Sequence, residues 1–173
     1  MSITLYNETS LGGGGQTYTE DVPDMKDFSN RARSLKVEGY PWVAFTKKAF
    51  QGEFKIYRVG QYMNLNDFAV KISSLRVIKE SLENPQITLY KNVNYTGAGK
   101  DIFEEIDNVD QIKKEIGGEI SSHKIKEGVW ILCKDEHFCG ERMFTKENVP
   151  NYVQIGWKNQ LSSLKPLTPS DFE

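Results

Sequence analysis

Short runs of apolar and β-branched residues recur along the whole chain, separated by polar stretches rich in Gly, Asn, Asp and Pro. Runs of this length and composition, bounded by turn-forming residues, are typical of β-strands. The strands predicted in this way are residues 3–6, 34–37, 42–45, 54–59, 74–78, 87–90, 123–126, 129–133 and 141–145. Short strands at this spacing predict an all-β sandwich or barrel.

One segment has helical spacing instead. In residues 107–116, Val109, Ile112 and Ile116 fall on one face of a helix, and the remaining positions are mostly charged. Asp107 or Asn108 would cap its first turn. We predict a short connecting helix here, with a solvated outer face.

A repeat underlies the strand pattern. An apolar residue, four spacers, a second apolar residue, one spacer and a glycine recur four times. The four units are "YNETSLGG" from Tyr6, "FTKKAFQG" from Phe45, "YKNVNYTG" from Tyr90 and "CKDEHFCG" from Cys133. Their glycines are Gly13, Gly52, Gly97 and Gly140. A glycine at one place in four hairpins indicates a backbone position with positive φ, which glycine adopts at little cost.

Each unit also ends on a serine followed by a strand-like run. These serines are Ser34, Ser74, Ser122 and Ser163. The second and fourth units carry a tryptophan shortly before they begin, Trp42 and Trp130. The chain is therefore a repeat of a repeat, A-B then A-B, and four strands in each unit predict Greek keys.

The run of four glycines from Gly12 to Gly15 raises the alternative of a phosphate-binding loop. Such a loop feeds a helix and usually carries a Lys followed by Ser or Thr. Here "QTYTEDV" follows, which alternates like a strand, and no Lys comes after the glycines. We therefore interpret this run as part of the first hairpin.

The repeat resembles the βγ-crystallin superfamily, with its aromatic-x4-aromatic-x-Gly signature, its Ser in each Greek key and its Trp at the second motif. The resemblance covers residues 3 to 167, and the units from Phe45 and Tyr90 carry the signature in full. Leu11 and Cys133 stand where aromatics are usual, but both are apolar. The resemblance implies an all-β chain of two βγ-crystallin domains, each a β-sandwich of two Greek-key motifs.

The domain boundaries follow from the resemblance and the composition. We expect a first domain at residues 1–79, a polar linker at 80–85, a second domain at 86–167 and a tail at 168–173. Family members pair their domains through an apolar patch of the second and fourth motifs. Here the resemblance places Val43 and Ile56 against Ile131 and Phe144.

The resemblance also indicates which members of the family this chain is most similar to. The segment from Glu20 to Phe45 is similar to vertebrate members, and the composition resembles the non-lens, epidermis-differentiation-specific proteins of amphibian and fish skin more than a lens γ-crystallin. The tail "LTPSDFE" resembles the start of a linker, so we expect a longer parent protein.

Composition and charge narrow the partners. The chain of 173 residues has 22 basic and 24 acidic side chains, a net charge of −2, and its basic residues are scattered and form no stripe. We therefore expect no nucleic-acid partner. No apolar run is long enough to cross a membrane. The N-terminus has no secretory-signal pattern, which predicts a cytoplasmic protein, with non-classical secretion from skin as the alternative.

The resemblance raises the question of calcium, which many members bind through Asn/Asp-Asn/Asp-x-x-Ser/Thr-Ser. The matching stretches are residues 29–34, 69–74, 117–122 and 158–163, and none is intact. The remaining candidate ligands are Ser73, Ser121, Asn159 and Ser162. Arg33 replaces one ligating hydroxyl, and a guanidinium repels a cation. We expect no cofactor, with weak calcium binding as the alternative.

Catalysis finds little support in the residues. His123 lies in a predicted strand, and His137 lies beside Cys139 in an exposed hairpin with no orienting partner visible in the sequence. The acidic residues between Asp101 and Asp110 are typical of a solvated loop. We predict no catalytic residues and no enzyme.

The sequence therefore predicts a non-catalytic structural or interaction module, the N-terminal part of a longer non-lens protein. The alternatives are a weak calcium-binding protein, a lens structural crystallin, and the crystallin module of an aerolysin-like pore-forming complex, which relatives imply. The expected partners are the paired domain of the same chain and, beyond it, a trefoil-factor-like subunit or a second copy.

Overall fold

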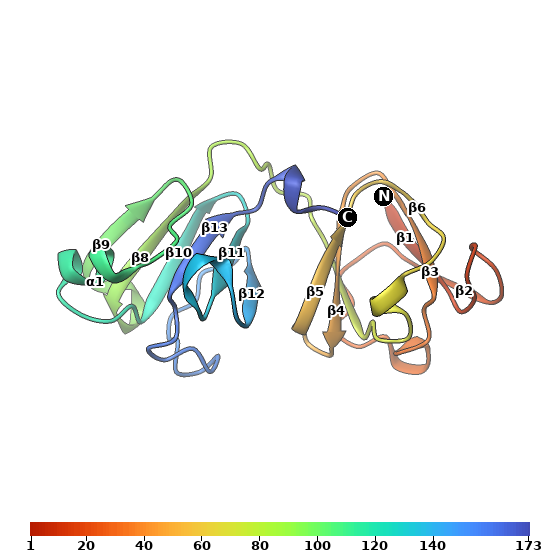
Figure 1. The fold of residues 1–173 in the computed structure, drawn as a ribbon, viewed down its shortest axis with the longest axis horizontal. Helices are drawn as coiled ribbons and strands as arrows, with labels where there is room; N and C mark the ends of the chain where they lie inside the picture. The colour runs from red at the N-terminus through yellow and green to blue at the C-terminus, as the bar shows by residue number, and fades with distance from the viewer. The chain divides into compact units, whose positions relative to one another are not determined.

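Almost all regular structure in this protein is β-sheet. The structure, a computed structural model, describes every residue from 1 to 173. Thirteen strands form four sheets, and a single short α-helix accompanies them. The chain divides into two units, one of Met1–Lys79 with Pro169–Glu173 and one of Glu80–Thr168 (Figure 1). The predicted all-β fold class is confirmed.

The first unit contains seven strands in two antiparallel sheets. Their orders are β2-β1-β3-β6 and β5-β4-β7. The strands are β1 (Ser2–Tyr6), β2 (Gly15–Tyr18), β3 (Ser34–Glu38), β4 (Trp42–Lys47), β5 (Gln51–Tyr57), β6 (Gly60–Tyr62) and β7 (Ser74–Val77). The glycine run thus leads into β2, an edge strand, and not into a helix.

The two halves of the first unit exchange edges. β6 comes from the second half but pairs with β3 of the first half, where Tyr62 lies opposite Leu35. In the other sheet, Val22 of the first half bridges Leu75 of β7 through backbone hydrogen bonds of 2.8 and 3.0 Å. Each sheet therefore holds parts of both motifs, which is the Greek-key arrangement.

The core of the first unit follows the two-residue period of its strands. Ile3 and Leu5 of β1 and Trp42 and Ala44 of β4 are fully buried members of one apolar cluster. Thr4, the one residue between Ile3 and Leu5, points to the other face, where its hydroxyl lies 2.9 Å from that of Thr17. A register slip of one residue in β1 would therefore move Ile3 and Leu5 out of the core.

The second unit repeats this plan with six strands. Its antiparallel sheets have the orders β10-β8-β9 and β12-β11-β13. The strands are β8 (Gln86–Asn92), β9 (Thr96–Ile102), β10 (Ser122–Glu127), β11 (Trp130–Cys133), β12 (Arg142–Thr145) and β13 (Ser163–Pro166). Single bridges, His123 with Val149 and Ile106 with Leu164, mark the exchanged edges.

The predicted helix is present but shorter. Helix α1 spans Asp110–Ile116, and the side-chain oxygen of Asn108 accepts the Asp110 N–H at 2.8 Å. It ends at Gly117, whose φ of +78° closes the last turn. Ile112 and Ile116 face the second core as expected.

The remaining connections include single turns of 3₁₀-helix. These turns are Lys26–Phe28, Asn66–Phe68 and Pro169–Asp171. The short segments Val93–Tyr95 and Glu136–Phe138 are irregular turns, because Asn94 and His137 have left-handed φ values of +57° and +59°. No helix in the structure combines the length and the apolar character that a membrane crossing requires.

Candidate functional site

Four buried serines tie the four hairpins to the strands that close them. Each Oγ accepts one backbone N–H and donates to one backbone C=O, and each serine is fully buried. Ser34 bonds Leu11 (3.0 Å) and Glu8 (2.6 Å), Ser74 bonds Phe50 (3.1 Å) and Lys47 (2.6 Å), Ser122 bonds Tyr95 (3.1 Å) and Asn92 (2.7 Å), and Ser163 bonds Phe138 (2.9 Å) and Asp135 (2.6 Å). We call these contacts the serine clasps.

Each clasp holds a strained piece of backbone. Two consecutive residues in every hairpin have φ between +56° and +62°, namely Ser10–Leu11, Ala49–Phe50, Asn94–Tyr95 and His137–Phe138. Only glycine adopts this region without a steric cost, so the clasp offsets a local penalty. Two residues later comes the repeated glycine, for example Gly52 with a φ of +82°. A Cβ at Gly52 would collide with the hydroxyl of Thr46.

A cation covers the hairpin aromatic in three of the four units. Arg76 lies 4.8 Å from the Phe50 ring, and Lys124 lies 4.9 Å from the Tyr95 ring. In the fourth unit Lys165 lies 5.6 Å from Phe138. Each cation sits two residues after the clasp serine, so one strand supplies both contacts. The first unit has Leu11 at the aromatic position and lacks this contact.

The two calcium-like loops of the first unit run beside each other. The Asn30 N–H donates to the Ile72 carbonyl at 2.9 Å, and the Val70 N–H donates to the Ala32 carbonyl at 2.8 Å. Ser73 donates its hydroxyl to the side-chain oxygen of Asn30 at 2.8 Å. The candidate ligand Ser73 thus has a partner, Asn30, that the sequence analysis did not single out.

The candidate ligands of the second unit are held mainly through their backbones. The Ser121 carbonyl accepts the Tyr152 N–H, and the Ser162 carbonyl accepts the Val109 N–H, both at 2.9 Å. Asn159 is exposed and has a φ of +56°. The structure contains no group of three His, Cys, Asp or Glu side chains placed to hold a metal ion.

These loops do not fit a tightly bound calcium ion. Calcium prefers six to eight oxygens with several carboxylates among them. Glu119 is the one carboxylate in the four loops, and it pairs with Lys113 at 3.0 Å. Val70 brings a methyl-bearing side chain to a left-handed position, and Arg33 and Lys158 add positive charge.

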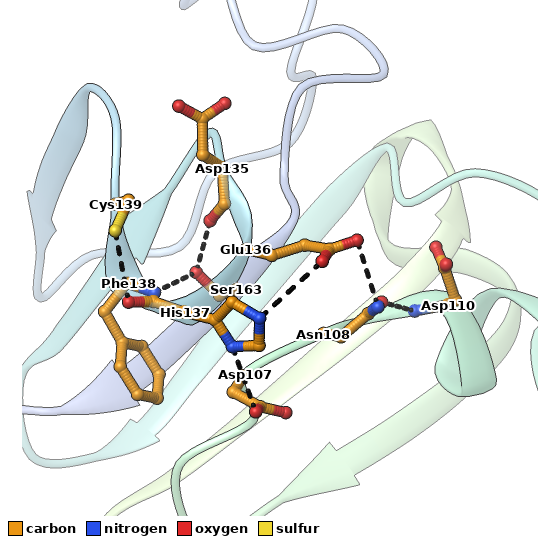
Figure 2. Close-up of polar contacts among 9 residues, drawn as sticks. All are labelled: Asp107, Asn108, Asp110, Asp135, Glu136, His137, Phe138, Cys139 and Ser163. Carbon is orange, nitrogen blue, oxygen red and sulfur yellow. Dashed lines mark hydrogen bonds and ion pairs between the residues drawn. The ribbon is translucent and has the colours of Figure 1, made fainter.

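His137 has an orienting partner that the sequence did not reveal. Figure 2 shows its ring between two carboxylates, with Nδ1 3.2 Å from Asp107 and Nε2 3.9 Å from Glu136. The His137 N–H also donates to the Asp107 carbonyl at 2.9 Å. All three side chains are more than half exposed, so the group joins the hairpin to the loop before α1 at the surface.

The two cysteines do not form a catalytic pair with this histidine. Cys139 is exposed, and its Sγ donates to the backbone carbonyl of His137, 3.5 Å away, and not to the ring (Figure 2). Cys133 is buried at the end of β11, and burial raises the pKa of its thiol. A raised pKa disfavours the thiolate that nucleophilic chemistry needs.

His123 is fully buried in the second unit. Its Nδ1 lies 2.7 Å from the Tyr152 hydroxyl, and its Nε2 lies 3.1 Å from both the Thr145 hydroxyl and the Glu147 carbonyl. Burial lowers the pKa of His123 to about 4. The imidazole therefore stays neutral at pH 7. It forms a polar bridge between β10 and the loop of residues 146–152.

The four residues expected at a domain interface share one property. Val43 lies opposite Ile56 on β4 and β5, and Ile131 lies opposite Phe144 on β11 and β12. All four are buried, yet none belongs to the core cluster of its own unit. Their pairing across units stays a prediction.

Sequence reasoning missed the partners that come from distant segments. Asp107 meets His137, Tyr152 meets His123, and Asn30 meets Ser73, over separations of 29 to 43 residues. The repeat aligns equivalent positions but gives no sign of which polar side chains meet across motifs. The four-fold spacing was the signal that identified the clasp serines.

Comparison with known sequences identifies one family in both units of the chain. A family model described as Beta/Gamma crystallin matches residues 2–78 and 86–167. The Epidermal differentiation-specific protein of Cynops pyrrhogaster is 32% identical over 172 residues, which covers 96% of this chain and 50% of that protein. Beta/gamma crystallin domain-containing protein 1 of Homo sapiens is 24% identical over 95% of this chain and 8% of its own length. The chain thus spans half or less of these relatives.

Two solved structures described as beta-gamma crystallins resemble parts or most of the chain at low identity. Geodin, a beta-gamma crystallin from Geodia cydonium, covers 96% of this chain and 98% of its own, at 20% identity and a TM-score of 0.41. A beta gamma crystallin from Ciona intestinalis covers 45% of this chain and 100% of its own, at 23% identity and a TM-score of 0.44.

Proposed function

The chain belongs to the beta/gamma crystallin family, and on that premise we propose that it is a non-catalytic structural and interaction module of a longer, epidermal-type protein. The observation that carries this proposal is the match to the Epidermal differentiation-specific protein of Cynops pyrrhogaster. That match uses 96% of this chain but only 50% of the relative. The two domains then correspond to one half of a larger protein.

The use made of the repeated residues supports a structural role. The clasp serines and the repeated glycines all stabilise hairpins. The residues that repeat most regularly in the sequence therefore have structural roles. A module of this kind contributes rigidity and surface, and it presents sheet edges and loops to partners.

The state of the nucleophilic and basic side chains supports the non-catalytic part. His123 has both ring nitrogens engaged in a buried network, and Cys133 is buried with a raised pKa. His137 and Cys139 are exposed but do not contact each other through ring and sulfur. Nucleophilic catalysis needs a base within hydrogen-bonding reach of the nucleophile.

The proposal is tested by the size of the native protein. An antibody raised to this chain would be used on denaturing gels of the source tissue, with epidermis compared against lens. We expect a band in epidermis at about twice the 19.8 kDa of this chain, by proportion to its share of the newt relative. A single band at 19.8 kDa, or one confined to lens, would overturn the proposal.

A further inference from the structure

The segment Pro169–Glu173 binds the first unit although it follows the last strand of the second. Phe172 forms a parallel bridge with Ile56 of β5, and the Glu173 N–H donates to the Ile56 carbonyl at 2.7 Å. β5 is the outer strand of the sheet β5-β4-β7, and the outer edge of a sheet offers unpaired backbone groups. The segment therefore covers part of an open sheet edge through a single bridge, which uses the same backbone groups as strand addition.

Two side chains of the first unit fix the backbone of this segment. Arg58 donates through Nη2 to the Pro169 carbonyl at 3.0 Å and through Nε to the backbone oxygen of Glu173 at 3.1 Å. The Tyr62 hydroxyl lies 2.9 Å from the Arg58 carbonyl and 3.2 Å from the same Glu173 oxygen, and its single hydrogen can be donated to either. Because a guanidinium is a rigid fork, Arg58 sets the spacing of the two backbone oxygens that it binds. These contacts select a segment by its backbone shape, which includes the 3₁₀ turn Pro169–Asp171.

Further contacts select side chains. The Arg58 guanidinium lies 5.7 Å from the centre of the Phe172 ring, a position that favours an aromatic residue. The Lys55 ammonium pairs with Asp67 at 2.6 Å and also lies 3.6 Å from a carboxylate oxygen of Glu173, so an acidic residue next in the chain gains a second, longer ionic contact. The edge is thus complementary to an aromatic residue followed by an acidic one.

The second unit uses a cation at the equivalent place for a different purpose. Lys146 directly follows β12, as Arg58 directly follows β5. Its ammonium lies 3.1 Å from both carboxylate oxygens of Glu80, at the start of the linker. Lysine offers a point charge without a planar fork, so it suits a carboxylate and lacks the two-oxygen geometry of Arg58. The site on β5 is therefore particular to the first domain.

We propose that the outer edge of β5, with Lys55, Arg58 and Tyr62, is a peptide-binding site for a segment in which a short turn is followed by an aromatic residue and then an acidic one. Pro169–Glu173 is its occupant within the chain, and a partner protein that presents the same chemistry competes with it. The proposal extends the interaction role given above. The two proposals can fail separately. A native protein of 19.8 kDa would contradict the proposal of a longer parent protein and would not affect the test of peptide binding.

The test uses the whole chain with the internal occupant weakened by Phe172→Ala and Glu173→Ala. The probe is the peptide LTPSDFE, acetylated and amidated so that it adds no terminal charges, titrated while the amide resonances of Ile56 and Arg58 are followed by NMR. A tethered occupant acts at a local concentration of roughly 1 mM, so the weakened chain should bind the peptide at least about ten-fold more tightly than the original chain.

Two further variants identify the residues that recognise the peptide. In the weakened chain, Arg58→Ala should reduce peptide affinity by at least about ten-fold, because two backbone contacts and the ring contact are lost. Lys146→Ala, the matched control in the second domain, should leave the affinity unchanged. The proposal is overturned if the weakened chain shows no saturable shifts at millimolar peptide, if it binds no better than the original, or if both variants bind equally.

Discussion

The Nδ1 atom of His123 lies 2.7 Å from the hydroxyl of Tyr152, and both side chains are almost completely buried. The two rings meet edge to face, with centres 5.5 Å apart. Burial lowers the pKa of His123 to about 4 and raises the pKa of Tyr152. This contact joins β10 to the loop of residues 146–152, and the lowered pKa of His123 leads us to expect that acid destabilises the second domain.

The first prediction is a loss of stability in mild acid. The unfolded chain takes up a proton on His123 near its ordinary pKa of 6.5, whereas the folded domain does so only near 4. The stabilisation is therefore complete above pH 6.5 and is lost as the pH falls toward 4. We expect the free energy of unfolding to drop by about 2.5 kcal/mol between pH 7 and 4.5 from this group alone.

Urea unfolding at several pH values would measure this effect. Carboxylates also titrate in the same range, so the matched control is His123→Gln, which cannot gain a proton. The variant should be less stable at pH 7 and should show a flatter pH dependence. An identical pH dependence in both proteins would contradict the assignment.

The second prediction concerns the serine clasps. Ser163→Ala removes a hydroxyl that bonds the Phe138 N–H and the Asp135 carbonyl, and leaves both groups without that partner. We expect a loss of about 1–3 kcal/mol in the free energy of unfolding, measured by urea titration. Ser162→Ala is the matched control, since Ser162 is bonded only through its backbone, and it should cost less than about 0.5 kcal/mol. Equal losses would argue against the clasp.

The third prediction is a gain in stability at a strained residue. Val70 has a φ of +57°, is 40% exposed and is β-branched, so its conformation is costly. The equivalent positions in the first and fourth units are Asn30 and Asn159, with φ of +62° and +56°. We expect Val70→Asn to raise the free energy of unfolding by about 0.5–1 kcal/mol, measured as a higher midpoint in urea titration. A neutral or destabilising result would show that the loop offsets this strain elsewhere.

The fourth prediction is that calcium binds weakly if at all. The four loops supply one carboxylate, already paired with Lys113, and Val70, Arg33 and Lys158 stand at unsuitable places. Calorimetry on EGTA-stripped protein should give a dissociation constant no tighter than about 0.1 mM. Ser73→Ala should leave the heat signal unchanged. A constant in the low micromolar range would contradict this view of the loops.

The repeat predicted much of the fold because its physical demands are local. Gly52 and its three equivalents needed a positive φ, and the short apolar runs between turn-forming residues predicted the all-β class. The division into two domains was implied by the family resemblance. Strands without an apolar pattern were not predictable: β9 is "TGAGKDI", in which only Ile102 is buried. Its ladder with β8 rests on backbone pairing and on a hydrogen bond from the Thr88 hydroxyl to Asp101, neither of which an apolar pattern reveals.

The site was less predictable, because its contacts join residues that are far apart in the sequence. His137 looked unpartnered until the loop before α1 brought Asp107 to its ring. The segment Pro169–Glu173 looked like a tail, and only the fold brings it to Arg58, more than 100 residues earlier. Neither contact follows from strand pattern or repeat spacing.

The most direct test of the structural account is amide hydrogen exchange at Leu11, Phe50, Tyr95 and Phe138, the donors to the four clasp serines. These residues lie in hairpins, where exposed amides normally exchange fast. We predict that all four exchange slowly, and that the amide donated to Ser163 loses its protection in Ser163→Ala while the other three keep theirs. Fast exchange at all four sites in the unmodified chain would contradict the claim that the repeated residues hold the fold.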